Sequence, residues 1–189
     1  MRLLGCSERG STLRDQCVDM IIKKVNFVSE IQIRKVEEED FLRIIDFTNN
    51  CAPIPKERNS IYHCLTRFFA NTCFVAERQG NIIGHILGWI SQVDDKIAYV
   101  HNVCIMPEGR RHKIATKLYD RFIKAVKEIG CDQIFLIANA MNDVSINFHR
   151  SLGFKPTIEG EKIIINGVET IKDYNGPGEH MVLMRKDLS

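Results

Sequence analysis

Several signatures that classify a protein at once are missing from this sequence of 189 residues. No apolar run reaches the ~18–20 residues that span a bilayer, so we expect no membrane contact. The seven cysteines form no C-x-x-C pair and no Cys/His group with zinc spacing, so we expect no bound metal. Their odd number and mostly apolar surroundings are typical of reduced, buried thiols, which predicts a cytoplasmic protein.

An excess of charge of one sign is also missing. The chain has 26 Lys and Arg against 24 Asp and Glu, so its net charge at pH 7 is only +2. This balance argues against a nucleic-acid partner, because such binding rests on many phosphate contacts. The motifs G-x-x-x-x-G-K-S/T and G-x-G-x-x-G are absent, which excludes a P-loop and a dinucleotide fingerprint. Any positive site must therefore be local.

What the chain does contain, from Ile31 onward, is a series of strand and helix patterns. Apolar alternation and short apolar runs predict strands over 31–36, 73–77, 82–90, 97–106, 133–138 and 181–184. Helical spacing predicts helices over 37–50, 60–70, 110–129 and 143–152. This order predicts an α/β fold with a mixed sheet and helices on both faces. We expect a single domain over 31–189, preceded by an N-terminal extension over 1–30.

A basic cluster follows the strand 97–106, where the longest helix is expected to begin. It consists of Arg110, Arg111, His112 and Lys113, placed by the pattern in the first helical turn. Cations there oppose the helix dipole at a cost of ~0.3–1 kcal/mol each, unless an anion binds the free N–H groups of the helix end. These residues by themselves leave three interpretations open: an anion site, a solvated basic turn, and a phosphate-contacting turn of a nucleic-acid-binding domain.

Two segments resemble the motifs of the GNAT acetyltransferases. Arg110–Ala115 is similar to the family motif R/Q-x-x-G-x-G/A, and Asn142–Phe154 is similar to N-x-x-A-x-x-F-Y-x-x-x-G-F. The resemblance implies a mixed, mostly antiparallel sheet and an N-acetyltransferase that moves an acetyl group from acetyl-CoA to a primary amine by direct attack. Two positions depart from the motifs, because Lys113 replaces a glycine and His149 replaces a tyrosine.

The resemblance also implies which residues hold acetyl-CoA. Main-chain groups of the strand would pair with the pantetheine arm, the amides from Arg111 to Thr116 would hold the pyrophosphate, and Asn142 would contact the arm from the far side. The expected cofactor-binding residues are Val103, Cys104, Ile105, Arg110, Arg111, His112, Lys113, Ile114, Ala115, Thr116 and Asn142.

Polar residues interrupt the apolar strand 97–106 at His101 and Asn102. An uncompensated polar group there costs ~1–3 kcal/mol, so each needs a partner or a role. An alkylamine with a pKa of ~10.4 is protonated at pH 7, and freeing its lone pair costs about 4–5 kcal/mol. A leaving thiolate with a pKa of ~8.5 needs only about 2 kcal/mol, so a base matters more than an acid.

Resemblance to the arylalkylamine acetyltransferases, which have a histidine at the matching position, predicts His101 as the general base. Tyr99 is the alternative proton carrier. His149 either protonates the departing thiolate or only orders the sulfur end of the cofactor.

Lys113 and His149 also favour a second interpretation, a regulatory module that binds acyl-CoA without turnover. The acceptor stays open between a small-molecule amine and a peptide or protein amine, and a homodimer also stays open. The segment 50–60 and the turns near Asn166 and Asn175 are expected to line the acceptor cleft.

Overall fold

The computed structural model describes residues 18, 20–22, 30–49 and 61–188. The chain separates into two units, residues 1–31 and residues 32–189. In the first unit, residue 18 and residues 20–22 are helical. None of the described helices has both the length and the apolar character that crossing a membrane requires.

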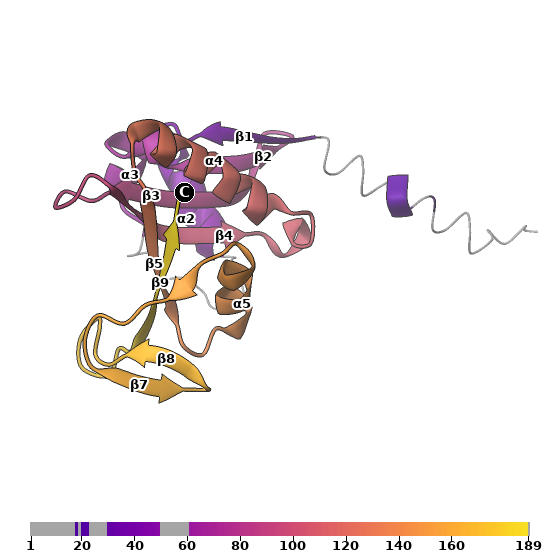
Figure 1. Cartoon of the computed structure of the whole chain (residues 1–189). Helices are drawn as coiled ribbons and strands as arrows, with labels where there is room; N and C mark the ends of the chain where they lie inside the picture. Colours follow the sequence, from indigo (N-terminus) through magenta and orange to yellow (C-terminus); the bar gives the residue numbers. More distant parts are fainter. Residues whose placement is uncertain (1–17, 19, 23–29, 50–60, 189) are drawn as a thin grey trace, which may run out of the picture. The chain divides into compact units, whose positions relative to one another are not determined.

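One sheet runs through the second unit (Figure 1), and in the described residues it has nine strands. Its strands, in spatial order, are β1 (Ile31–Lys35), β2 (Phe74–Arg78), β3 (Asn81–Ile90), β4 (Ile97–Ile105), β5 (Gln133–Asn139), β9 (Met181–Asp187), β8 (Val168–Ile171) and β7 (Lys162–Ile165). The short β6 (Lys155–Pro156) pairs with β9. The β4–β5 pair is parallel, whereas β2–β3, β3–β4, β5–β9 and β8–β9 are antiparallel. The expected mixed, mostly antiparallel sheet is confirmed.

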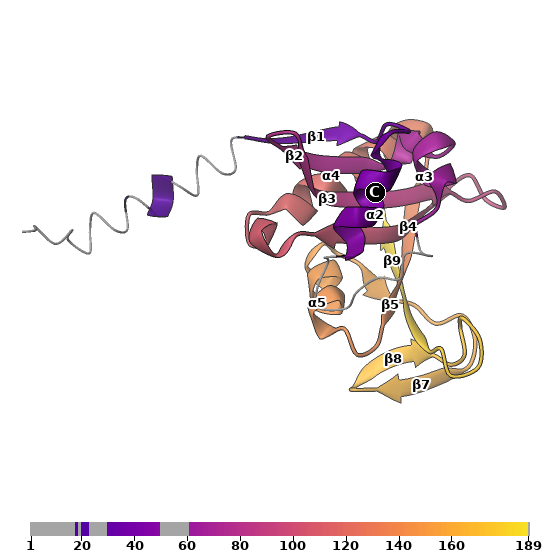
Figure 2. The same cartoon turned by 180° about the vertical axis from the view of Figure 1, so that it is seen from behind.

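Helices cover both faces of this sheet, as the sequence predicted. Four α-helices are α2 (Asp40–Asn49), α3 (His63–Arg67), α4 (Ile114–Ile129) and α5 (Asp143–Ser151), within the residues that the structure describes. Two 3₁₀ turns are η2 (Ala70–Thr72) and η3 (Pro107–Gly109). Helix α4 lies in front of β2–β4 in Figure 1, and α2 lies in front of them in the reverse view of Figure 2.

Each face of the sheet has its own apolar core. Ile44 of α2 and Leu65 of α3 pack with Val75 and Leu87 in one buried cluster. On the other face Phe122 of α4 is fully buried, and its ring lies where a side chain at Gly88 would have to go. Alternation along β2 and β3 thus supplies both cores, since successive side chains of a strand point to opposite faces.

The start of the longest helix differs from the prediction, which placed it at Arg110. Pro107–Gly109 forms a 3₁₀ turn, and Arg111 and Lys113 adopt φ values of 65° and 59°. This left-handed conformation cannot continue a right-handed helix, so α4 begins only at Ile114. The basic cluster therefore forms a loop before the helix and not its first turn.

The predicted end of the longest helix at residue 129 is confirmed. Gly130 closes α4 with a φ of 108°, and its N–H donates to the carbonyl oxygens of Val126 and Lys127. Asn166 and Gly167 both have positive φ and form the two-residue turn between β7 and β8.

The second predicted helix is shorter than 60–70. It covers only His63–Arg67, and the N–H groups of Phe68 and Phe69 both donate to the carbonyl oxygen of Cys64. This sharing of one acceptor ends the regular helix before the turn η2. The segment 50–60, expected to line the acceptor cleft, lies outside the described residues.

Candidate functional site

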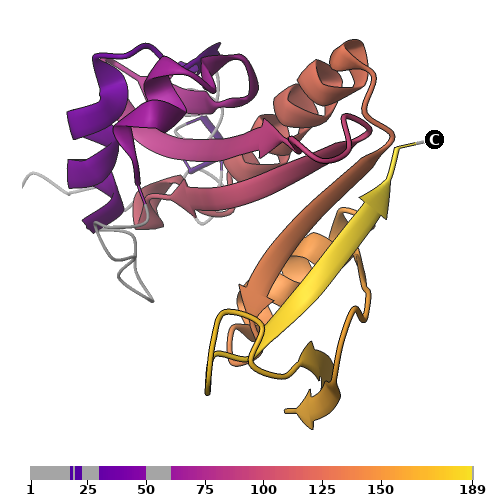
Figure 3. The same cartoon turned by 90° about the vertical axis from the view of Figure 1, so that its left-hand side faces the viewer.

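Strands β4 and β5 separate halfway along β4. Their parallel pairing runs from Ile97 opposite Gln133 to Val100 opposite Leu136. Past this point the two strands diverge, as Figure 3 shows. On the other side of β4, Leu87 lies opposite Asn102 but Gly88 lies opposite Val100. His101 is therefore the extra residue of a β-bulge, at the position where β4 leaves β5.

The expected pantetheine-binding residues lie on the divergent end of β4. Val103 and Ile105 are half-buried and stand opposite Ile86 and Gly84 of β3. Cys104 is buried and belongs to the core beneath α2.

The cysteines do not all match the expectation of reduced, buried thiols. Cys64, Cys73 and Cys131 are free, but Cys64 is exposed, and Cys104 is disulfide-bonded. Burial, as the largest cause, raises the pKa of the Cys73 thiol to about 12, so this thiol keeps its proton at neutral pH.

The start of α4 offers main-chain donors. The N–H of Lys117 is bonded to the carbonyl oxygen of Lys113 at 3.0 Å, as the first turn of the helix requires. Ahead of it lie the amides of Ile114, Ala115 and Thr116, and Lys113 at the N-cap provides no side-chain cap for them. Such amides, at the positive end of a sixteen-residue helix, are suited to bind an anion.

Cations surround these amides. Arg110, Arg111 and Lys113 are exposed, and among the described side chains no carboxylate forms an ion pair with them. His112, between them, is half-buried. The loop before α4 thus combines free positive charge with helix-end donors, which fits the diphosphate of coenzyme A.

Asn142 lies at the start of α5. Its side-chain oxygen accepts a hydrogen bond from the N–H of Ser145 at 3.1 Å, so the residue is the N-cap of this helix. This bond gives Asn142 a structural role in addition to the cofactor contact that the sequence predicted.

His101 is half-buried beside two aromatic rings from other parts of the chain. Its ring centroid lies 5.1 Å from that of Trp89 on β3 and 6.5 Å from that of Tyr62, which precedes α3. The Trp89 ring is in turn 5.2 Å from the ring of Tyr99. Sequence reasoning missed Tyr62 and Trp89, although Trp89 is the only tryptophan of the chain and lies in a strand adjacent to β4.

Tyr99 keeps its proton at neutral pH. Burial first, and the nearby Tyr174 second, raise the pKa of the Tyr99 hydroxyl to about 12. Tyr174 belongs to the loop between β8 and β9, so this loop reaches the same region as β4. The turn near Asn175, which the sequence placed at the acceptor cleft, follows Tyr174 directly.

Asn102 has the partner that its buried position requires. The Oδ1 of Asn102 lies 2.9 Å from the Nε2 of His85, and both residues are buried. With Oδ1 as acceptor, Nε2 of His85 carries the donated hydrogen. The ring of Phe47 on α2 stands edge-on to His85 at 5.4 Å.

His149 is buried between α4 and α5. Its Nε2 lies 2.7 Å from the hydroxyl of Tyr119, and its Nδ1 lies 3.3 Å from the hydroxyl of Ser145. Burial raises the pKa of Tyr119, so this hydroxyl stays protonated, and the tautomer of His149 decides whether it donates to Nε2 or accepts from it. A proton leaving His149 would have to break one of these two contacts.

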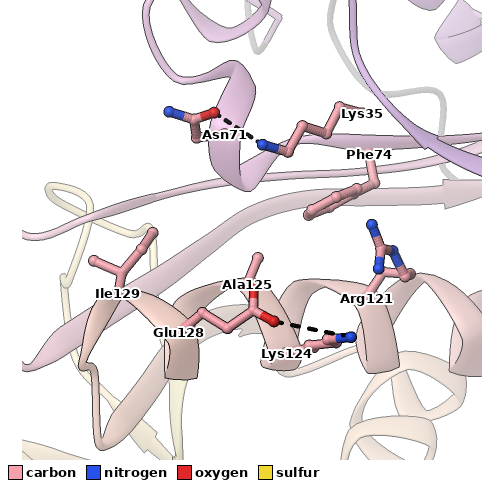
Figure 4. Close-up of a pocket in the computed structure, with 8 residues that line it drawn as sticks. All are labelled: Lys35, Asn71, Phe74, Arg121, Lys124, Ala125, Glu128 and Ile129. Carbon is pink, nitrogen blue, oxygen red and sulfur yellow. Dashed lines mark hydrogen bonds and ion pairs between the residues drawn. The ribbon is translucent and has the colours of Figure 1, made fainter.

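A cavity of about 190 Å³ lies elsewhere, between the end of β1, the start of β2 and the second half of α4 (Figure 4). Local contacts account for its three cations: Lys35 donates to Asn71 at 3.0 Å, Lys124 lies 3.8 Å from Glu128, and Arg121 lies 5.5 Å from the ring centroid of Phe74. Its lining shares no residue with the bulge or with the loop before α4. The described residues also contain no group of three or more His, Cys, Asp or Glu side chains placed to hold a metal ion.

The model of the acetyltransferase (GNAT) family matches residues 36–154, which include β4, the loop before α4 and α5. The chain belongs to the GNAT family. This assignment confirms the family resemblance of the two motifs and makes the chain an acetyl-CoA-dependent N-acetyltransferase.

Relatives and solved structures agree with this GNAT assignment. An N-alpha-acetyltransferase of Sulfurisphaera tokodaii is 28% identical over 125 residues, which cover 61% of this chain and 68% of the relative. The crystal structure of Ard1 from Thermoplasma volcanium has a TM-score of 0.69 at 17% identity, covering 85% of this chain and 99% of Ard1. Arabidopsis thaliana Naa50, solved with a bisubstrate analogue, has a TM-score of 0.66 at 14% identity, covering 84% of this chain and 99% of Naa50. At these identities the two structures show that the GNAT fold is shared.

Proposed function

We propose that this chain acetylates the α-amino group of a peptide or protein, with His101 as the general base. The observation that carries this proposal is the placement of His101 as the extra residue of the β4 bulge, where β4 leaves β5. The α-amino acceptor is supported by the similarity to a relative named N-alpha-acetyltransferase.

Acetyl-CoA supplies the activated acetyl group as a thioester. His101 would accept the proton that the amine must lose before its nitrogen can attack directly. Because an α-amino group has a pKa of only ~7.7–8.0, this step costs about 1 kcal/mol at pH 7, against about 4–5 kcal/mol for an alkylamine. Tyr99 cannot take this proton, because its hydroxyl remains protonated up to a pKa of about 12. It can donate a hydrogen bond or relay a proton through water.

The residues before α4 would hold the cofactor. The amides of Ile114–Thr116 and the side chains of Arg110 and Arg111 would bind the pyrophosphate, and the main chain of Val103 and Ile105 would position the pantetheine arm. This assignment is supported by the free cations and helix-end donors of the loop.

The aromatic rings near His101 would receive the acceptor. Tyr62, Trp89 and Tyr99 form an apolar wall with polar tips beside the base. Such a wall suits an amine attached to an apolar side chain, since aromatic faces also attract the ammonium form of the amine. Tyr174 of the β8–β9 loop would border the same wall.

His149 would order the site and not act as the acid. Both of its ring nitrogens face protein groups, the hydroxyls of Tyr119 and Ser145.

A second candidate function is an acyl-CoA-binding regulatory module without turnover. One observation favours it: Lys113, with a side chain and a left-handed conformation, stands where the family motif has glycine. A cytoplasmic location and a homodimer also stay predictions.

The two candidates differ in thiol release. We expect wild-type protein to release free thiol from acetyl-CoA with at least one acceptor in a panel of peptides and small amines. His101→Gln should lower kcat/KM by about 100-fold, the usual contribution of a general base, and remove the limb of the pH profile that rises toward alkaline pH. The matched control is His63→Gln, a surface histidine near Glu38, which should leave kcat/KM unchanged.

An unchanged pH profile in His101→Gln would refute His101 as the base. Binding of acetyl-CoA without thiol release for every acceptor would favour the regulatory module.

A further inference from the structure

The buried pair His85 and Asn102 lies beside the bulge that separates β4 from β5. His85 is fully buried in β3, Asn102 is 3% exposed in β4, and their side chains lie 2.9 Å apart. We infer that this hydrogen bond fixes the register of the bulge and thereby positions His101 for catalysis. His85 and Asn102 are then positioning residues, and the inference rests on the proposed role of His101.

The bulge determines which face of the sheet His101 occupies. Residues opposite each other in an antiparallel pair point to the same face. Asn102 stands opposite Leu87, so in a regular ladder without the bulge His101 would stand opposite Gly88. That position lies on the face covered by Phe122 of α4. In the observed register Val100 takes that position, and His101 packs against Trp89 on the opposite face.

The His85–Asn102 bond holds the bulge on one side. His85 stands opposite Cys104, and Asn102 stands opposite Leu87, so the bond runs diagonally between the two strands. It ties the residue next to His101 to the middle of β3. A one-residue slip would turn Asn102 to the other face and break this bond.

Gly88 permits the bulge on the other side. A Cβ at this position would lie 2.4 Å from the carbonyl oxygen of Tyr99 and 2.7 Å from the ring of Phe122. Only glycine allows the two backbones to come this close. Strand β3 thus shapes the bulge through two residues, His85 by a hydrogen bond and Gly88 by the absence of a side chain.

Stability alone does not require a polar pair at this place. Replacing both partners of a buried hydrogen bond by apolar groups of similar shape is close to neutral, whereas removing one partner leaves the other unsatisfied. A pair that serves only the fold can therefore be exchanged for two leucines without loss of activity. A pair that sets the register of the bulge cannot be exchanged in this way without loss of activity.

The experiment compares four variants: His85→Leu, Asn102→Leu, the double Leu variant, and His85→Gln, which keeps an N–H donor. We expect both single Leu variants to lose stability in urea, and the double variant to regain most of it. The double variant should still have a kcat about 100-fold below wild type, because a misplacement of about 1 Å has this effect. His85→Gln should restore kcat to within about three-fold of wild type.

Two further readouts separate positioning from general damage. Binding of ADP, which has the diphosphate but no pantetheine arm to contact Val103 and Ile105, should stay within about three-fold of wild type in the double variant, because the loop before α4 is untouched. The single tryptophan, Trp89, lies 5.1 Å from His101, so its fluorescence reports the bulge without turnover. We expect an altered emission spectrum in the double variant and a wild-type spectrum in His85→Gln.

A double variant with wild-type kcat and wild-type Trp89 emission would overturn the inference, as would a kcat that follows stability across all four variants. A wild-type protein that releases no thiol with any acceptor would instead refute the proposed function. In that case an unchanged Trp89 emission in the double variant would still refute the role of the pair in the bulge.

Discussion

Arg34 and Arg43 are surrounded by acidic groups, whereas the arginines of the loop before α4 are not. Arg34 lies 2.6 Å from one carboxylate oxygen of Asp40 and donates from Nε to Glu77 at 2.8 Å. Arg43 lies 2.7 Å from the other oxygen of Asp40. Asp40 is 1% exposed, so this network connects β1, α2 and β2 from inside the fold.

Arg110 and Arg111 have the opposite environment. Both are exposed on a loop, and no described carboxylate neutralises either of them. The net charge of +2 does not distinguish the two groups, because it counts paired and unpaired arginines alike. A cation paired inside the protein supports the fold, whereas we predict that the unpaired cations beside the helix-end amides bind a ligand.

The largest effect is expected when the paired group is broken. Asp40→Asn should lower the free energy of unfolding by about 3 kcal/mol, the lower end for breaking a buried ion pair, because Asp40 is buried but Arg34 keeps Glu77 as a partner. The measurement is urea unfolding at pH 7. The matched control is Asp120→Asn, an exposed carboxylate on α4, which should change stability by less than about 0.5 kcal/mol. A loss as small as that of the control would show that the network is not structural.

Asp40 also makes the stability of the protein depend on pH in the acid range. Burial acts to raise the pKa of Asp40, but hydrogen bonds from Arg34 and the N–H of Glu37, and the charges of Arg34 and Arg43, lower it overall. A lowered folded-state pKa stabilises the protein above the ordinary value of about 3.9, and this contribution is lost as pH falls below it. Asp40→Asn should therefore lack this part of the acid dependence.

A smaller effect is expected at the unpaired group, and on binding only. Arg110→Gln and Arg111→Gln should each raise the Kd of coenzyme A by about 10- to 100-fold, the effect of losing a charge-assisted hydrogen bond. Calorimetric titration at two salt concentrations measures this, and the salt dependence should weaken. Arg67→Gln, which removes an arginine already paired with Glu38, is the control. If Arg110→Gln or Arg111→Gln unfolded at a lower urea concentration than wild type, these arginines would support the fold, which would contradict the comparison.

The smallest effect concerns the backbone of Lys113. Its left-handed conformation has a φ of 59°, which is costly for any residue with a Cβ. Lys113→Gly should be more stable than Lys113→Ala by about 1 kcal/mol, because both lose the cation and only glycine relieves the strain. Equal stability of the two variants would show that the backbone at residue 113 is not strained. Their equal loss of coenzyme A affinity would assign the effect on binding to the charge.

Local features were predictable from the sequence because few residues determine them. Gly130 ends α4, and Asn166–Gly167 turns β7 into β8, since each adopts a positive φ that its residue type tolerates. The family and the fold class were also predictable, from two motifs on the expected elements. The start of α4 was wrong because Arg111 and Lys113 adopt the left-handed region, which neither residue type favours.

The candidate site was predictable in part. His101 and Asn102 were visible as polar interruptions in an apolar strand, and Arg110 and Arg111 as an unusual cluster of charge. The aromatic neighbours of His101 were not visible, because Tyr62 and Trp89 come from elements distant in sequence. The partner of Asn102 was not visible either, since His85 shows no signal that separates it from an ordinary core histidine.

The sequence by itself determined the order of strands and helices, the caps and turns, the family and the set of residues available for chemistry. Each of these follows from periodicity or from short segments, where neighbours along the chain act on one another. Only the tertiary structure decided that β4 bulges at His101, that the bulge faces Trp89, and that β4 leaves β5 there. These features depend on the register between strands, which arises from contacts such as His85 with Asn102 and Gly88 with the Tyr99 carbonyl.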